Sequence, residues 1–303
     1  MFKSEKTKLI LTLVLACVLL AVIVALRPEN SQGVPMTQFW NNKFRVASQF
    51  DIVAAGDSRV LHGLDMQQLE EAGLGQGFNF GFRGSPSSPE YISAASDCLS
   101  DDGKRILVLG ITPNGFTKNA VSTSGFSQKR DDFKSSWEAP VLWRQIEQKF
   151  RPITLADAKR LVTRKRNPLQ ETWHANGWIE MSHKKPDQKL ALRFYKVRFN
   201  GNMAKSDLVD KACESIAQSV RDGVRVFGFK PPVSTEMTEL ESEKSGFDYE
   251  TFVKQFESAG GVWIDVDPSQ FQTYDGSHLH SESATAFSKW IANEIRTYLE
   301  GAQ

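Results

Sequence analysis

The chain has 303 residues, of which 40% are hydrophobic and 24% are charged. This composition is typical of a globular protein long enough for one large domain or two small ones. The 37 basic residues nearly balance the 36 acidic ones and leave a net charge of +1. That balance excludes a global basic field for nucleic acid, and it excludes the acidic bias of a disordered chain.

Cysteine usage gives no indication of a metal site. Cys17, Cys98 and Cys213 form no Cys-x-x-Cys motif and no Cys/His cluster, so we expect no structural zinc, no other metal and no cofactor. Cys98 and Cys213 lie in helix-like stretches, where cysteine packs as a small hydrophobic residue. A basic cluster between positions 159 and 166 is interpreted as a solvated helix face. A surface for an anionic polymer or lipid headgroup is the alternative.

An apolar run without charge covers residues 9–26, and three lysines lie within residues 1–8. A run of this length can span the hydrocarbon core of a bilayer. The lysines favour a cytoplasmic N-terminus, which places the rest of the chain on the extracytoplasmic side. A cleaved signal peptide is the alternative, but no clean small-x-small site follows the run. We therefore expect a single-pass anchor, followed by a juxtamembrane linker and short helix over residues 27–49.

From residue 50 onward, apolar runs typical of strands alternate with amphipathic segments typical of helices. The strand-like runs cover residues 51–55, 77–80, 105–109, 224–229 and 262–266. The helix-like segments cover residues 64–72, 89–99, 205–222, 248–259 and 281–299. Such alternation predicts an α/β fold with three α/β/α layers, in which helices cover both faces of a central, mostly parallel sheet.

The segment at about 117–200 interrupts this alternation and contains four of the seven tryptophans. We interpret it as an insertion of helices and loops over one edge of the sheet. Within it, residues 193–199 alternate in polarity, which predicts a strand. His174 and Trp178 are candidate substrate-binding residues because aromatic faces suit sugars; simple packing of the insertion is the alternative.

Two polar segments at strand ends carry the residues of a nucleophilic site. Ligands of an open α/β sheet bind outside the carboxyl ends of its strands. Gly56-Asp57-Ser58 follows the first strand, and Asp275-Gly-Ser-His278 follows the last. A serine nucleophile needs a base, and the base needs an orienting acceptor. We therefore expect Ser58 as nucleophile, His278 as general base and Asp275 as its orienting carboxylate, with Asp57 supporting the turn.

These blocks resemble the SGNH (GDSL-like) hydrolase superfamily. Gly56-Asp57-Ser58 is similar to its first block, Asn79-Phe-Gly-Phe-Arg-Gly84 to its second, and Asp275-Gly-Ser-His278 to its last. The resemblance spans residues 50–303 and implies an SGNH/flavodoxin-like fold with serine esterase chemistry. It also implies an oxyanion hole to which the backbone N–H groups of Ser58 and Gly84 donate.

The third block departs from the family pattern. Gly-x-Asn-Asp is expected, but Gly110-Ile-Thr-Pro-Asn114 places the asparagine two positions later. Asn114 is therefore either a third oxyanion donor or a turn residue. The departure resembles a membrane-anchored subgroup, the proteins of alginate-type O-acetylation and of teichoic-acid D-alanylation. That resemblance implies acyl transfer onto cell-surface polymers, often beside a membrane-bound O-acyltransferase.

Four further residues near these blocks are candidates for the site. Arg59 and Arg83 could bind an anionic substrate group, with structural salt bridges as the alternative. His62 lies one helical turn after Ser58 and faces either solvent or the site. His280 is a second candidate base, or else the residue at which the last helix begins.

Three functions are compatible with these features. The first is an extracytoplasmic serine esterase or O-acyltransferase acting on cell-surface glycan or related esters. The second is an inactive scaffold or binding module that keeps the fold, which the altered third block suggests. The third is a lipase or thioesterase that uses the anchor to reach membrane substrates.

Overall fold

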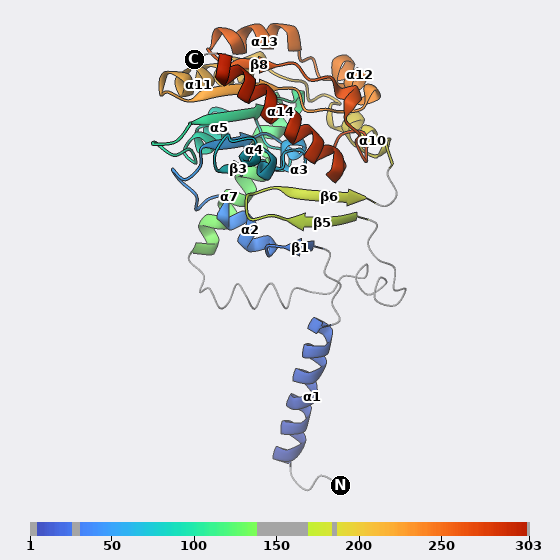
Figure 1. Cartoon of the computed structure of the whole chain (residues 1–303). Helices are drawn as coiled ribbons and strands as arrows, with labels where there is room; N and C mark the ends of the chain where they lie inside the picture. Colours follow the sequence, from blue (N-terminus) through green and yellow to red (C-terminus); the bar gives the residue numbers. More distant parts are fainter. Residues whose placement is uncertain (1–4, 26–30, 138–168, 184–186, 302–303) are drawn as a thin grey trace. The chain divides into compact units, whose positions relative to one another are not determined.

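The computed structural model describes residues 5–25, 31–137, 169–183 and 187–301 (Figure 1). The chain divides into two compact units. The first comprises residues 1–30 and 135–167, and the second comprises residues 31–134 and 168–303. The basic cluster between positions 159 and 166 lies outside the described residues.

Helix α1 (Glu5–Ala25) belongs to the first unit. Throughout the part of the chain that the structure describes, no helix combines the length and the apolar character needed to cross a membrane. The structure therefore does not confirm the transmembrane anchor predicted over residues 9–26.

A five-stranded parallel sheet forms the centre of the second unit. Its strands are β2 (Ile52–Ala55), β3 (Gly77–Asn79), β4 (Ile106–Gly110), β7 (Arg225–Phe229) and β8 (Val262–Ile264). They lie in the order β3-β2-β4-β7-β8, with every neighbouring pair parallel. Along the chain this is the doubly wound order 2-1-3-4-5, whose switch point lies between β2 and β4. The predicted α/β fold with a parallel sheet is confirmed.

Helices cover both faces of this sheet. One face packs against α5 (Pro89–Ser96), α11 (Ser206–Arg221) and α13 (Tyr249–Ser258), and the other against α3 (Ser58–Gly63), α4 (Met66–Glu71) and α14 (Ser281–Gly301). Successive strand residues alternate between the two cores, so that Val53 joins the first and Ile52 the second. Burial on both faces explains why the strands are apolar at nearly every position.

A second, three-stranded sheet was not anticipated; two of its strands lie in the predicted insertion and one lies in the predicted juxtamembrane segment. It consists of β1 (Ser31–Gly33), β5 (Leu169–Trp173) and β6 (Ile179–His183). Strands β1 and β5 are parallel, whereas β5 and β6 form an antiparallel hairpin. Helix α2 (Met36–Asn42) follows β1 and supplies Phe39 and Trp40, whose rings both contact Trp173.

The strand predicted over residues 193–199 is wrong. These residues belong to helix α10 (Leu190–Arg198) and its C-cap. Tyr195 and Phe199, four residues apart, are buried, while Phe194 and Val197 are exposed, which is the spacing of a helix face. Further helices are α6 (Lys118–Ser122), α7 (Gly125–Trp137) and α12 (Thr235–Lys244), with 3-10 turns at Pro113–Phe116 and Pro268–Gln270.

Candidate active site

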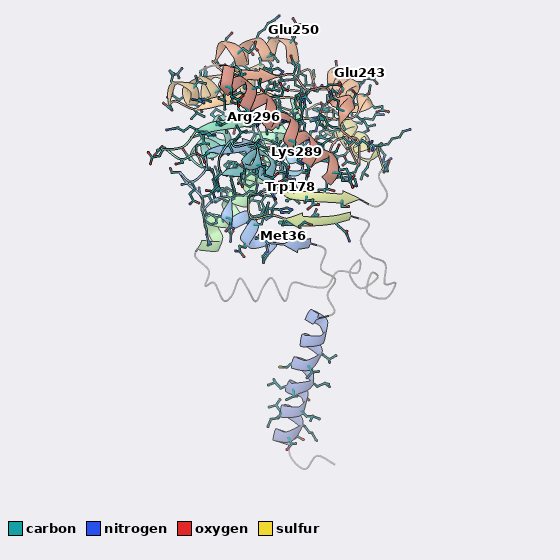
Figure 2. The ribbon with its side chains drawn as sticks, viewed as in Figure 1. Met36, Trp178, Glu243, Glu250, Lys289 and Arg296 are labelled. Atoms are coloured by element: carbon teal, nitrogen blue, oxygen red, sulfur yellow. The ribbon has the colours of Figure 1, made fainter. Side chains whose placement is uncertain are left out.

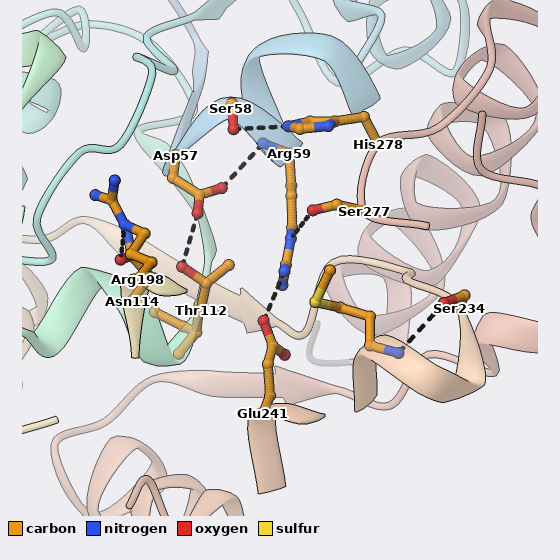
Figure 3. Close-up of polar contacts among 12 residues, drawn as sticks. Asp57, Ser58, Arg59, Thr112, Asn114, Arg198, Ser234, Glu241, Ser277 and His278 are labelled. Atoms are coloured by element: carbon orange, nitrogen blue, oxygen red, sulfur yellow. Dashed lines mark hydrogen bonds and ion pairs between the residues drawn. The ribbon is translucent and has the colours of Figure 1, made fainter. Parts of the chain in front are cut away.

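Ser58 is the first residue of α3 and stands at the carboxyl end of β2, beside the switch point of the sheet. Asp57 caps this helix, since its Oδ1 accepts a hydrogen bond from the Arg59 N–H at 2.9 Å. The backbone before it is tightly packed: a Cβ at Gly56 would lie 2.9 Å from the Gly110 carbonyl oxygen. The expectation that Asp57 supports the turn is confirmed, and the turn presents Ser58 at the sheet edge (Figure 3).

Ser58, His278 and Asp275 form a continuous hydrogen-bonded series. The Ser58 Oγ lies 2.8 Å from the His278 Nε2, and the His278 Nδ1 lies 2.8 Å from the Asp275 Oδ2. The other Asp275 oxygen accepts from the backbone N–H groups of Ser277 at 2.9 Å and His278 at 2.8 Å. The structure thus brings together three residues that lie 220 positions apart at the extremes.

The charge state of Asp275 sets the protonation of the imidazole. Burial raises the pKa of Asp275, but hydrogen bonds from His278 and from the backbone outweigh it, so the pKa lies below its usual value. An ionised Asp275 can only accept, so the His278 Nδ1 carries the proton and donates it. The Nε2 lone pair is then left to accept the Ser58 hydroxyl proton, which is the arrangement that activates a serine nucleophile.

Three donors that were predicted to form the oxyanion hole are unused. In the described ranges, the backbone N–H groups of Ser58 and Gly84 and the Asn114 Nδ2 donate to no acceptor. Gly84 is half-buried and adopts a left-handed φ of +63°, which favours glycine. Asn114 is buried at the start of the segment after β4, and its Oδ1 accepts from the Arg198 Nε. Free donors at such a site suit the oxyanion of an acyl-transfer intermediate.

The second block is tied to the helix that carries Ser58. The Asn79 Nδ2 donates to the carbonyls of Val60 at 2.8 Å and Leu64 at 2.9 Å, and its Oδ1 accepts from the Gly81 N–H at 2.9 Å. A Cβ at Gly81 would lie 2.6 Å from the Leu61 nitrogen, so glycine permits this close approach. Because the Gly81 N–H is already engaged, Gly84 is the glycine of this block with a free donor.

Lys43 supports the same turn from α2. It is almost fully buried, and its Nζ donates to the carbonyls of Asn79, Gly81 and Gly177. Burial lowers the pKa of Lys43 well below its usual value. Lys43 thus connects the turn before Gly84 to the β5–β6 hairpin.

Arg59 is directed away from solvent. Its side chain is 1% exposed and pairs with the equally buried Glu241 of α12, at 2.6 Å between Nη2 and Oε1. Its Nε donates to the Ser277 Oγ at 3.0 Å (Figure 3). The Tyr195 ring lies 5.2 Å from the Arg59 guanidinium. Burial lowers the pKa of Arg59, but the charges of Glu241, Tyr195 and Asp57 and the hydrogen bond to Glu241 together outweigh it and raise the pKa overall. A structural ion pair therefore describes Arg59 better than substrate binding.

The other predicted substrate-binding residues have partners outside the hydrogen-bonded series. Arg83, with a 55% exposed side chain, pairs with Glu171 at 3.0 Å. The His174 Nε2 lies 3.2 Å from the Glu180 Oε2, and its ring stacks on Trp178 at 4.7 Å. Trp178, labelled in Figure 2, is buried in the turn between β5 and β6. These contacts favour packing for His174 and Trp178.

His62 is a buried neighbour of the site. Its ring meets the His278 ring edge-on, with 5.5 Å between centroids, and its Nδ1 donates to the Ile179 carbonyl at 3.1 Å. Burial, followed by the nearby His278, lowers the pKa of His62 well below its usual value. His62 is therefore neutral at pH 7. His280 directly precedes α14, and its carbonyl accepts from the Ala284 N–H at 2.8 Å.

Four residues that hydrogen-bond to Asp57, Arg59 or Asn114 were not predicted from the sequence. Thr112 donates to the Asp57 Oδ2 at 2.9 Å, while Ser277, Glu241 and Arg198 make the contacts given above. Thr112 and Ser277 stand inside segments that the sequence singles out. Glu241 and Arg198 lie on helices distant in sequence, and nothing in their local pattern marks them.

Comparisons with known proteins add little to this geometry. No protein-family profile matches the chain, and no curated protein matches it. A solved structure from Streptococcus pneumoniae, provisionally described as a platelet activating factor, is similar with a TM-score of 0.40 and 12% sequence identity. The match covers 86% of this chain and 90% of that one. A likeness at this level indicates nothing about function.

Proposed function

We propose that the protein is a serine esterase or O-acyltransferase that works through an acyl-Ser58 intermediate on cell-surface polysaccharide or related esters. The observation that carries the proposal is the hydrogen-bonded series Ser58–His278–Asp275, with 2.8 Å at each link. An inactive scaffold needs no such alignment. The three donors expected to form the oxyanion hole also have no acceptor among the described residues, which favours turnover over binding alone.

The reaction has two half-reactions. The Ser58 oxygen attacks the ester carbonyl carbon while the His278 Nε2 takes the hydroxyl proton, and Asp275 stabilises the resulting imidazolium. The oxyanion accepts hydrogen bonds from Ser58, Gly84 and Asn114. Collapse expels the alcohol, which receives the proton from His278. Water or a sugar hydroxyl then attacks the acyl-serine, again with His278 as base, and frees Ser58.

The site of action is part of the proposal and rests on the sequence. Residues 9–26 are apolar and follow a lysine-rich start, so we propose an N-terminal anchor with the catalytic unit outside the cytoplasm, acting beside a membrane-bound O-acyltransferase. Alkaline extraction of membranes tests the anchor: the full chain should stay in the pellet, and a chain lacking residues 1–26 should not. Release of the full chain would contradict the anchor and leave the chemistry untouched.

Fluorophosphonate labelling tests the chemistry. The wild-type protein should be labelled on Ser58, and Ser58→Ala should not be labelled. Ser87→Ala is the matched control, since Ser87 is a half-buried serine in the loop after Gly84. Labelling of the control should match the wild type. Equal labelling of wild type and Ser58→Ala, or none of either, would contradict the proposal, and the second result would favour an inactive scaffold.

Acceptor dependence separates the remaining possibilities. A transferase should give faster release of the alcohol when a glycan acceptor is added, with the acyl group recovered on the glycan. An esterase should give the free acid at the same rate with or without the glycan. Hydrolysis of long acyl chains by the chain lacking residues 1–26, with no polymer present, would favour the lipase or thioesterase alternative.

A further inference from the structure

Arg198 differs from the other arginines around the site in having no acidic partner. Arg59 pairs with Glu241, Arg83 with Glu171, and Arg193 with Asp187. Among the residues that the structure describes, no carboxylate lies within ion-pair distance of the Arg198 guanidinium. The group is nevertheless half-buried. A cation that is partly removed from water and lacks a counterion favours the binding of an anion.

The guanidinium lies between two of the candidate oxyanion donors. Its Nε donates to the Asn114 Oδ1, and its Nη2 would lie 3.3 Å from a Cβ placed on Gly84. Figure 3 shows Arg198 and Asn114 on the side of Asp57 opposite His278. Arg198 therefore stands beside the oxyanion region of Ser58, on the side away from the base.

The side chain is also held in place. The Phe194 ring lies 5.6 Å from the guanidinium, one helical turn earlier on α10, and cation–π contact of this kind steadies a guanidinium. The hydrogen bond to Asn114 fixes the other end. A preorganised guanidinium with unused N–H groups suits a carboxylate or phosphate, which it can bind through two parallel hydrogen bonds.

Asp57 and Asp275 are buried carboxylates of the site whose oxygens are engaged by other donors. The Asp57 oxygens accept from Arg59 and Thr112. Those of Asp275 accept from His278 and the adjoining backbone. A substrate anion is thus the partner that the site lacks.

We propose that Arg198 forms an anion-binding subsite beside the oxyanion hole, which recognises a carboxylate or phosphate carried by the substrate next to its ester. Through its hydrogen bond to Asn114, Arg198 is also a positioning residue for that side chain. The proposal rests on the proposed function, because it makes Arg198 a determinant of specificity for the ester that Ser58 attacks.

Paired substrates test the subsite. One pair is 4-nitrophenyl acetate and mono-4-nitrophenyl succinate; the other is glycerol acetate and its 3-phosphate. The wild type should favour one or both anionic members by at least tenfold in kcat/KM, and the pair that responds identifies the anion. Arg198→Gln should abolish the preference, Arg198→Lys should restore part of it, and the salt-bridged control Arg193→Gln should keep it. An unchanged anionic-to-neutral ratio in Arg198→Gln would overturn the proposal.

A binding measurement separates this proposal from the proposed function. Calorimetry with succinate and with inorganic phosphate needs no turnover. If wild type hydrolyses no ester but binds either anion, and Arg198→Gln binds it at least tenfold more weakly, the subsite stands while the esterase proposal fails. If esters are hydrolysed at Ser58 but neither the ratio nor the anion binding depends on Arg198, the esterase proposal stands and the subsite is wrong.

Discussion

Asp57 and Thr112 are joined by a buried hydrogen bond of 2.9 Å, which ties the turn that presents Ser58 to the loop after β4. The second Asp57 oxygen caps α3 through the Arg59 N–H. The Asp57 carboxylate therefore holds both the first turn of α3 and the loop segment that leads to Asn114. Within Gly110-Ile-Thr-Pro-Asn114, Thr112 is the residue that makes this connection.

Replacing Thr112 with valine should weaken both the fold and the site. The change preserves shape but leaves the buried Asp57 Oδ2 without its donor, which costs about 1–3 kcal/mol. The slackened turn should lower kcat by ~10–100-fold, because small misplacements of a nucleophile are costly. Urea unfolding and ester turnover measure the two effects. Thr112→Ser keeps the hydroxyl and should recover both; a valine variant as stable and active as wild type would contradict the assignment.

Removing only one partner of the buried ion pair Arg59–Glu241 should lower the free energy of unfolding strongly. Glu241→Ala leaves an uncompensated charge where both side chains are 1% exposed, and such changes cost about 3–5 kcal/mol. The double change to Arg59→Met and Glu241→Leu should recover most of the loss, because no charge is then stranded. Urea unfolding gives the comparison. Glu250→Ala, which removes an exposed pair with Lys254, should hardly change stability. A similarly small effect for Glu241→Ala would disprove the role of the pair.

His62 should make the stability depend on pH in a defined window. Its folded pKa lies well below the unfolded value of about 6.5, so the unfolded state binds more protons once the pH falls below that value. The stabilisation is complete above pH ~6.5 and decreases toward the folded pKa, by up to about 1.4 kcal/mol per pH unit. Unfolding free energies between pH 7.5 and 5.5 show this slope.

His62→Gln should flatten that slope, since its amide can still donate to the Ile179 carbonyl and does not titrate. The half-exposed His280 gives the matched control His280→Gln, which should keep the wild-type slope. The account of His62 is wrong if its glutamine variant shows an undiminished slope.

Asp275→Asn should abolish most turnover without unfolding the protein. The asparagine Oδ1 can still accept from the backbone N–H groups of Ser277 and His278. Its amide nitrogen, however, would face the His278 Nδ1 and favour the tautomer that cannot accept the serine proton. A fall in kcat of ~10³–10⁴-fold is expected, with the melting temperature measured alongside. Turnover within tenfold of wild type would show that Asp275 does not orient His278.

Sequence patterns predicted those strands and site residues that a short stretch of neighbouring residues is enough to identify. The apolar runs that became β2, β4 and β7 are buried on both faces, so their composition marks them. Ser58, His278 and Asp275 were found because their blocks follow strands. The β5–β6 hairpin has no continuous apolar run. Its residues are buried by contacts with α2 and by the pairing of β5 with β6, which short stretches of sequence do not reveal.

Residues 193–199 show how a local pattern can mislead. Apolar residues alternate with basic ones from Tyr195 to Phe199, as in a strand. Tyr195 and Phe199 are buried but Val197 is exposed, which fits a helix and not one face of a strand. The same helix brings Arg198 to Asn114 across 84 positions of sequence. Contacts of this kind come from the fold as a whole, so no local signal predicts them.

The most direct test of the central claim is to trap the intermediate. The protein is mixed with an excess of an activated acetyl ester, quenched in acid within the first turnover, and digested for mass spectrometry. The account predicts one acetyl group on the peptide that contains Ser58, and none on that peptide in Ser58→Ala. Ester turnover that persists in Ser58→Ala, or an acetyl group that appears on another residue in the wild type, would contradict it.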